Sequence, residues 1–84
     1  MPENVFFMHR IKFSSNTWDK GIEVKSTDGA DNLAAAKQAY HAYLGAWAYG
    51  HDANTSYVAC KITDLYGTVL MEETWIKPEG ENQA

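Results

Sequence analysis

The stretch from Asp31 to Gly50, DNLAAAKQAYHAYLGAWAYG, constrains the fold more than any other part of the chain. It contains seven alanines together with leucine, lysine and glutamine, all of which favour helices, and it contains no proline. Asp28 and Asp31 stand where a carboxylate can accept hydrogen bonds from the free N–H groups of a helix start. Gly50 stands where a left-handed residue commonly ends a helix. We therefore predict one helix over residues 31–50.

One face of this helix is predicted to pack on the protein core. Its larger apolar residues recur every three or four positions, as in a helix with one buried stripe. The opposite side carries alanines, and Gly45 in the interior indicates close packing or a slight bend. The stripe consists of Leu33, Ala36, Tyr40, Tyr43, Leu44 and Trp47.

Four other segments alternate in the manner of β-strands and are separated by turn residues. The first pair is predicted to be joined by a long loop over Ser15–Gly21, which carries Trp18. The second pair is predicted to be joined by a type I turn, Asp64-Leu65-Tyr66-Gly67, with Gly67 in the left-handed position. The predicted strands are Val5–Ser14, Ile22–Thr27, Ser56–Asp64 and Thr68–Lys77.

The predicted fold is α+β, with the order β-β-α-β-β and one helix packed on one face of a four-stranded antiparallel sheet. Eighty-four residues suffice for a single domain over 1–78, and the acidic segment 79–84 is predicted to be disordered. The second hairpin is predicted to pair Ile62 with Leu70, Cys60 with Glu72, and Tyr57 with Trp75, although one bulge would exchange its faces. The sheet residues predicted in the core are Phe7, Ile11, Phe13, Val24, Val58, Ile62 and Leu70.

Few side chains are candidates for catalysis or metal binding. These are His9, His41, His51, Asp52 and Cys60, and no two of them have the close spacing typical of zinc ligands. Cys60 alternates with Val58 and Ile62, so we expect a buried, unreactive thiol. Motifs for a serine nucleophile or a phosphate-binding loop are missing from the sequence. We therefore expect no enzymatic activity, no metal and no cofactor.

Both alternating sets of the second hairpin are apolar, and a single helix covers only one face of a sheet. Apolar sheet surface should therefore remain uncovered, which favours a protein-interaction or accessory domain that associates with itself or another protein. Tyr57 and Trp75 are predicted to anchor this interface, because aromatic residues dominate interface energetics. The candidate interface residues are Phe6, Met8, Tyr57, Val69, Met71 and Trp75.

The alternative is a single-stranded nucleic-acid binder that uses the open sheet face. Aromatic rings would stack on bases beside the basic residues of that face. The chain has seven basic and eleven acidic residues and a net charge of −4, which disfavours this alternative. The basic residues concerned are Arg10, Lys12, Lys25 and Lys61.

The remaining features concern location. Cys60 is the only cysteine, so no disulfide forms within the chain and a reducing compartment is favoured. We see no secretion signal in MPENVFFMHRIKF and no apolar run of membrane-spanning length. We expect a cytoplasmic protein without membrane contact, with a homodimer as one option.

Overall fold

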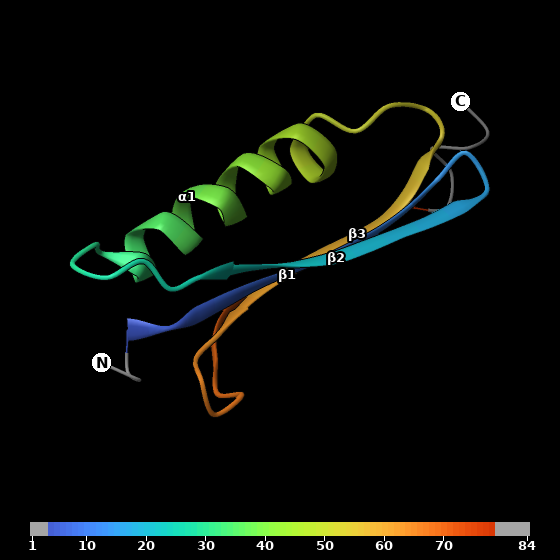
Figure 1. Ribbon diagram of the computed structural model, residues 1–84. Helices are drawn as coiled ribbons and strands as arrows, with labels where there is room; N and C mark the ends of the chain where they lie inside the picture. Colours follow the sequence, from blue (N-terminus) through green and yellow to red (C-terminus); the bar gives the residue numbers. More distant parts are fainter. Residues whose placement is uncertain (1–3, 79–84) are drawn as a thin grey trace.

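The computed structural model describes residues 4–78 and confirms the predicted β-β-α-β-β fold. The helix continues from its α-helical part into a short π-helical stretch, η2 (Figure 1). The acidic segment 79–84, predicted to be disordered, lies outside the described residues. The elements are β1 (Phe6–Ser14), β2 (Thr17–Lys25), α1 (Asn32–Leu44), η2 (Gly45–Tyr49), β3 (Thr55–Thr63) and β4 (Val69–Ile76).

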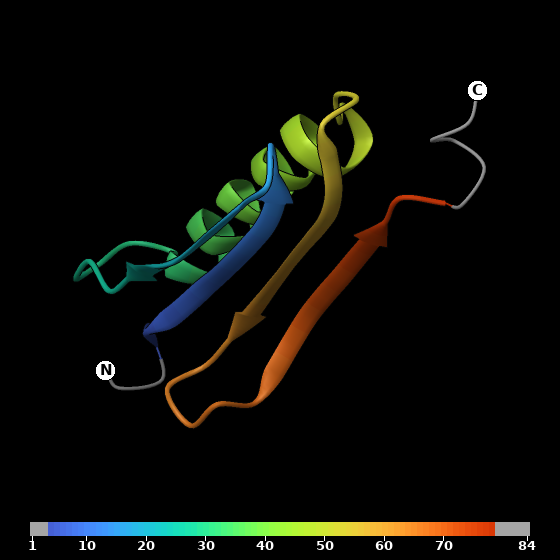
Figure 2. The ribbon, with the colours of Figure 1, turned by 90° about the vertical axis from the view of Figure 1, so that its right-hand side faces the viewer.

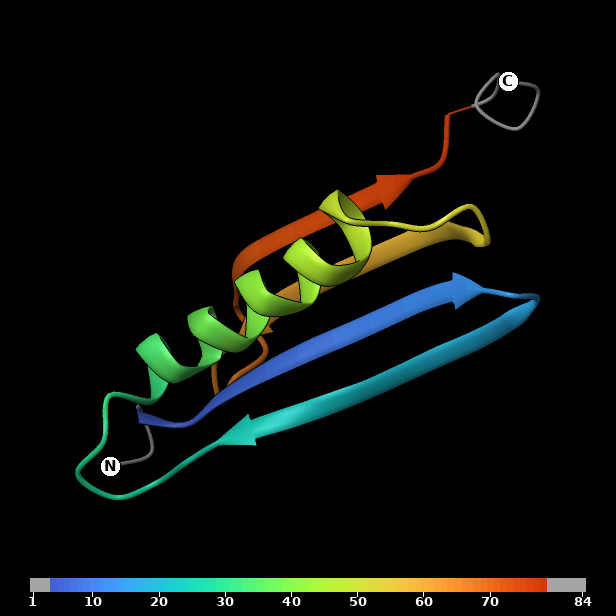
Figure 3. The ribbon, with the colours of Figure 1, turned by 90° about the horizontal axis from the view of Figure 1, so that it is seen from above.

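The four strands form one antiparallel sheet in the order β2-β1-β3-β4. Strands β1 and β3 occupy the centre, and β2 and β4 form the two edges (Figure 2). The helix follows β2, crosses over β1 and leads into β3, so it lies along one face of the sheet (Figures 1 and 3). The opposite face is not covered by any element of residues 4–78 (Figure 1).

The first hairpin closes more tightly than the sequence indicated. Ser15 and Asn16 have φ angles of 53° and 61°, so the turn has two left-handed residues, as in a type I′ turn. Ser14 pairs directly with Thr17. The predicted loop over Ser15–Gly21 is therefore wrong, and β2 begins at Thr17. Two-residue turns of this type usually contain glycine, as in Asn-Gly. The pair Ser15-Asn16 contains none, so the sequence did not indicate a tight turn at this point.

The second hairpin has the predicted turn. The Gly67 N–H donates to the Asp64 carbonyl at 3.2 Å, and Gly67 has a φ of 84°. The Asp64 carboxylate accepts hydrogen bonds from the Tyr66 and Thr68 N–H groups, each at 2.9 Å. These bonds satisfy backbone donors that the tight turn leaves outside the ladder.

A bulge shifts the register of this hairpin between Ile62 and Thr63. The extra residue moves every later pair by one position, so the predicted pairing is wrong and the faces of β4 are exchanged. The observed pairs are Ile62 with Met71, Cys60 with Glu73, and Tyr57 with Ile76.

The helix begins as predicted. The Asp31 carboxylate accepts a hydrogen bond from the Ala34 N–H at 3.0 Å, which caps the first turn. The buried Asn32 side chain donates to the backbone oxygens of Asn4 and Thr27, at 2.7 and 3.0 Å. These bonds join the helix start to the chain before β1 and after β2.

The end of the helix differs from the prediction. Gly50 has a φ of −107°, so it is not left-handed. A Cβ at this position would lie 2.9 Å from the Gly45 carbonyl oxygen, which explains the need for glycine. Gly45 itself starts the π-helical stretch and has open space around it, so of the two alternatives predicted for Gly45, close packing is wrong.

The predicted helix stripe is confirmed. Ala36, Tyr40 and Leu44 are buried, while Leu33, Tyr43 and Trp47 are partly buried against the core. The sheet side differs, because β1, β2 and β4 turn the other set of residues toward the helix, whereas β3 turns the predicted set toward it. The buried apolar sheet residues are Phe6, Met8, Val58, Cys60 and Ile62. Only Val58 and Ile62 belong to the predicted sheet core; the assignment of Phe7, Ile11, Phe13, Val24 and Leu70 to that core is wrong.

Candidate protein-interaction surface

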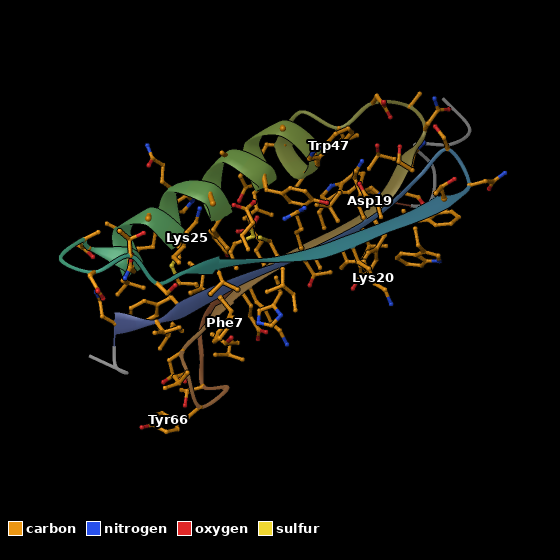
Figure 4. All side chains as sticks on the ribbon, in the orientation of Figure 1. Phe7, Asp19, Lys20, Lys25, Trp47 and Tyr66 are labelled. Carbon is orange, nitrogen blue, oxygen red and sulfur yellow. The ribbon has the colours of Figure 1, made fainter. Side chains whose placement is uncertain are left out.

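The sheet face opposite the helix, here called the open face, is defined by strand alternation. Met8 is 1% exposed beneath the helix, so its neighbours Phe7 and His9 point the other way. Residues paired across antiparallel strands share a face, which extends this assignment to all four strands. Figure 4 shows Phe7 and Lys20 on the open side, and Asp19 and Trp47 on the helix side.

The open face is mainly apolar. Its residues form four rows across the sheet, each row following the pairing of the strands. Val69 and Leu70, at the bulged end of β4, are 44% and 43% exposed. The rows are Val24, Phe7 and Thr63; Ile22, His9, Lys61 and Glu72; Lys20, Ile11, Ala59 and Thr74; and Trp18, Phe13, Tyr57 and Ile76.

Several large apolar side chains of this face lie in water. Trp18, Ile22, Val24 and Ile76 are each 54–65% exposed. Four strands at a spacing of about 4.8 Å and eight residues at a rise of about 3.3 Å cover roughly 19 by 26 Å, or about 500 Å². Monomeric proteins seldom expose a contiguous apolar patch larger than about 300–600 Å². The area of the open face includes the polar residues of the two middle rows, so the contiguous apolar part is smaller and lies within the range of the largest apolar patches on monomers.

Three aromatic rings gather at one end of the open face. The Phe13 and Trp18 ring centroids lie 4.9 Å apart, and those of Trp18 and Tyr57 lie 5.6 Å apart with a near-perpendicular, edge-to-face geometry. Trp18 joins this cluster because the two-residue turn brings it opposite Phe13. The rings support one another and form a pre-ordered apolar surface, as interface anchors commonly do.

The centre of the open face is hollowed. A depression of about 730 Å³ lies over the middle of the sheet, where the small side chain of Ala59 leaves room. Its rim carries charge of both signs. The open-face residues around it are His9, Ile11, Lys20, Ile22, Ala59, Lys61, Glu72 and Thr74.

His9 is a titratable group on the central strand β1, beside the depression. Its Nε2 lies 2.8 Å from the Thr63 hydroxyl oxygen, and Lys61 is its direct partner on β3. Partial burial lowers the pKa of His9 below its usual 6.5, and the positive charge of Lys61 lowers the same pKa further. The neutral form of His9 is therefore favoured on the open face.

The four basic residues of the predicted nucleic-acid face do not share one face. Lys61 is on the open face, whereas Arg10, Lys12 and Lys25 are on the helix side. These three pair with acids on β2. The Nζ of Lys12 also lies 3.6 Å from the centroid of the Trp47 ring. Grouping these residues as one nucleic-acid face is therefore wrong. The ion pairs are Arg10–Glu23 (3.2 Å), Lys12–Asp19 (3.5 Å) and Lys25–Glu23 (3.2 Å).

The predicted interface residues are also divided between the two faces. Phe6 and Met8 are buried under the helix, so their placement on uncovered surface is wrong. Met71 and Trp75 are partly buried against the same core. Tyr57 is on the open face, and Val69 is exposed at the end of β4.

The sequence interpretation missed the largest exposed open-face residues, Trp18, Ile22 and Ile76. One signal was available. A two-residue turn at Ser15 and Asn16 would have placed Lys12 opposite Asp19, and this charge pairing agrees with the observed register.

The remaining candidates for chemistry are dispersed. Cys60 is 3% exposed, and burial raises the pKa of its thiol to about 11. Its sulfur lies 3.3 Å from that of Met8. His51 stacks on Trp75, with ring centroids 4.1 Å apart, whereas His41 lies edge-on to Tyr40 on α1 and His9 is on β1. Within residues 4–78, no three His, Cys, Asp or Glu side chains are grouped closely enough to hold a metal ion.

No protein family, curated protein or solved structure matches this chain. In the part that the structure describes, no helix has the length and apolar character needed to cross a membrane.

Proposed function

We propose that this protein acts through protein–protein association, with a second copy of the same chain as the partner. Two copies pack open face to open face. The observation that supports this proposal is the mainly apolar open face, with Trp18, Ile22, Val24 and Ile76 more than half exposed. An antiparallel sheet can leave one face in water when that face is polar, whereas here the uncovered face of residues 4–78 carries large apolar side chains.

The size of the surface fits a modest homodimer. Two open faces of about 500 Å² each bury about 1,000 Å², near the lower limit of specific interfaces. Sheets that pack face to face lie about 10 Å apart, with side chains that interdigitate between them. The aromatic cluster of Phe13, Trp18 and Tyr57 supplies the anchor. We expect a dissociation constant in the micromolar range, because small interfaces leave little surplus over the cost of association.

Pairing through the sheet edges is less favourable. Glu72 and Glu73 stand next to each other in the middle of β4. Two β4 edges paired antiparallel about this point would bring four carboxylates together, and like charges on paired strands are destabilising. The open face is mainly apolar and carries charges of both signs, so it is the better surface for a second copy.

The remaining proposals concern catalysis, location and nucleic-acid binding. We propose that the protein is not an enzyme and needs no cofactor, since Cys60 is buried with a raised pKa and the histidines are dispersed. We also propose a cytoplasmic location, because a lone cysteine suits a reducing compartment. Nucleic-acid binding is disfavoured, since three of the four predicted basic residues are paired with acids on the helix side.

Sedimentation velocity with two matched variants tests the proposal. Ile22→Glu adds a charge to an exposed position on the open face, and Ala42→Glu adds the same charge on the outer side of α1. We expect dimers for the wild type and for Ala42→Glu, and monomers for Ile22→Glu. If Ile22→Glu associates like the wild type, the open face is not the interface. A monomeric wild type that binds single-stranded DNA, with affinity falling steeply as salt increases, would favour the nucleic-acid alternative.

A further inference from the structure

The open face has opposite charges at its two edges and a third charge, Lys61, on the central strand β3. Lys20 lies on the β2 edge, opposite Ile11 of β1. Glu72 lies on the β4 edge, opposite Lys61 of β3. Both side chains are exposed, both border the central depression, and the Lys20 and Glu72 rows are adjacent along the strands. The two edges of the open face therefore differ in charge, positive at β2 and negative at β4, with Lys61 between them.

This asymmetry distinguishes the ways in which two copies can stack. Most homodimers have two-fold symmetry, in which the same surface of each copy contacts the other. If the two-fold axis runs along the strands, β2 of one copy lies over β4 of its partner. If the axis runs across the strands, β2 lies over β2 and β4 over β4. In both cases, aligned packing allows the strands to cross at about 30°.

We infer that the two copies stack with β2 of each over β4 of the other, an inference that rests on the proposed self-association. In this arrangement Lys20 lies near the partner's Glu72, and the symmetry repeats the contact. In the other arrangement Lys20 lies near the partner's Lys20 and Glu72 near the partner's Glu72, so like charges meet twice. Lys61 lies on the central strand β3, where it is near the partner's Lys61 in either arrangement. Apolar residues occupy all four rows, so the charges at the two edges select the orientation.

The inferred arrangement also matches the two ends of the sheets. A two-fold axis along the strands keeps each end of one sheet over the same end of the other. The aromatic cluster then faces the partner's aromatic cluster, and Trp18 lies near the partner's Ile76. Both residues are more than half exposed in the single copy, at 56% and 65%, so both have apolar area left to bury.

A charge-swap experiment tests the inferred orientation. The dissociation constants of Lys20→Glu, Glu72→Lys and the double variant are measured by sedimentation equilibrium at low salt. Each single change turns two attractive contacts into two repulsive ones, so we expect association about tenfold weaker. The double variant restores opposite charges and should return to within about threefold of the wild type. High salt should reduce all these differences, because it screens exposed charges.

Lys37→Glu, an exposed position on the helix, makes the same charge change away from the interface and should associate like the wild type. The thermal midpoint of each variant shows whether the fold itself has changed. If the double variant is as weak as the product of the two single changes, or if the single changes have no effect, the inferred orientation is wrong. A wild type that stays monomeric refutes the self-association itself. A wild type that forms dimers whose dissociation constant does not respond to the charge changes refutes only the orientation.

Discussion

The Nε2 atom of His9 and the hydroxyl oxygen of Thr63 lie 2.8 Å apart, although the residues are 54 positions apart in the chain. This contact joins the two central strands on the open face. It occurs where β1 and β3 run antiparallel and where both side chains point away from the helix. The imidazole is thereby held beside Lys61, in a position that association of two open faces would bury.

The lowered pKa of His9 predicts loss of stability in mild acid. Because the folded-state pKa is below the unfolded value of about 6.5, the unfolded chain takes up the proton first. The contribution of His9 is therefore complete above pH 6.5 and is lost as pH falls through that value toward the folded pKa. We expect urea unfolding to show lower stability at pH 5.5 than at pH 7.5.

His9→Gln is the control for this prediction, because glutamine keeps a hydrogen-bonding group but does not take up a proton in this range. The pH-dependent difference should shrink in this variant. If it stays as large as in the wild type, another group is responsible. Dimer formation should weaken with acid in the same way, since covering the open face removes the remaining water from His9.

Removal of a core side chain should strongly destabilise so small a domain. Leu44 is 0% exposed between the helix and the sheet. Leu44→Ala should lower the free energy of unfolding by about 2–5 kcal/mol, through lost burial and the cavity left behind. Ala42→Ser, on the exposed side of the same helix, should be nearly neutral. Equal denaturation midpoints for both variants would contradict the assignment of the buried helix face.

Replacement of Gly45 and of Gly67 by alanine should change the stability of the protein in opposite directions. Gly45 has helical angles, and an added Cβ would meet nothing within 4 Å. Gly45→Ala should therefore stabilise the protein by up to about 1 kcal/mol. Gly67 has a φ of 84°, so Gly67→Ala should destabilise by about 1–2 kcal/mol. Thermal denaturation of both variants checks the pair, and a destabilising Gly45→Ala would show that the π-helical stretch requires glycine.

The Cys60 thiol should react very slowly in the native protein. With a pKa of about 11, it holds only about one thousandth of its population as thiolate at pH 8, and it is 3% exposed. Labelling with a thiol reagent should be complete within minutes in urea and minimal in native buffer. Fast labelling in native buffer would show that β3 opens readily or that Cys60 is accessible.

The helix and the second turn were predictable from local patterns. The helix stripe repeats every three or four residues, and the turn at Asp64–Gly67 has a glycine where a positive φ is needed. The single four-stranded sheet with one covered face followed from economy, since one helix between two hairpins fits this arrangement. The helix and the turn depend on residues that are close in sequence, whereas the pairing of β1 with β3 joins residues far apart in the chain.

The faces of the strands were not predictable in the same way. Strand alternation has a period of two, so the choice of the buried face reverses every residue of a strand at once. The set with Phe7, Ile11 and Phe13 is more apolar than the set with Arg10 and Lys12, yet the structure buries Phe6 and Met8. Lys12 lies beneath the helix with its charge close to Asp19 and the Trp47 ring. Asp19, which lies opposite Lys12 across the tight first turn, stabilises this placement of the Lys12 charge. If Ser15–Gly21 is assumed to be a loop, Lys12 has no such partner.

The most direct test of the proposed self-association is the molar mass in solution, measured by light scattering over a range of protein concentration. The single chain has a mass of 9.4 kDa. We predict that the mass increases from this value toward that of two chains, about 19 kDa, as the concentration passes through the micromolar range. A constant mass of one chain up to several hundred micromolar would contradict the account, because the open face would then be stable in water without a second copy.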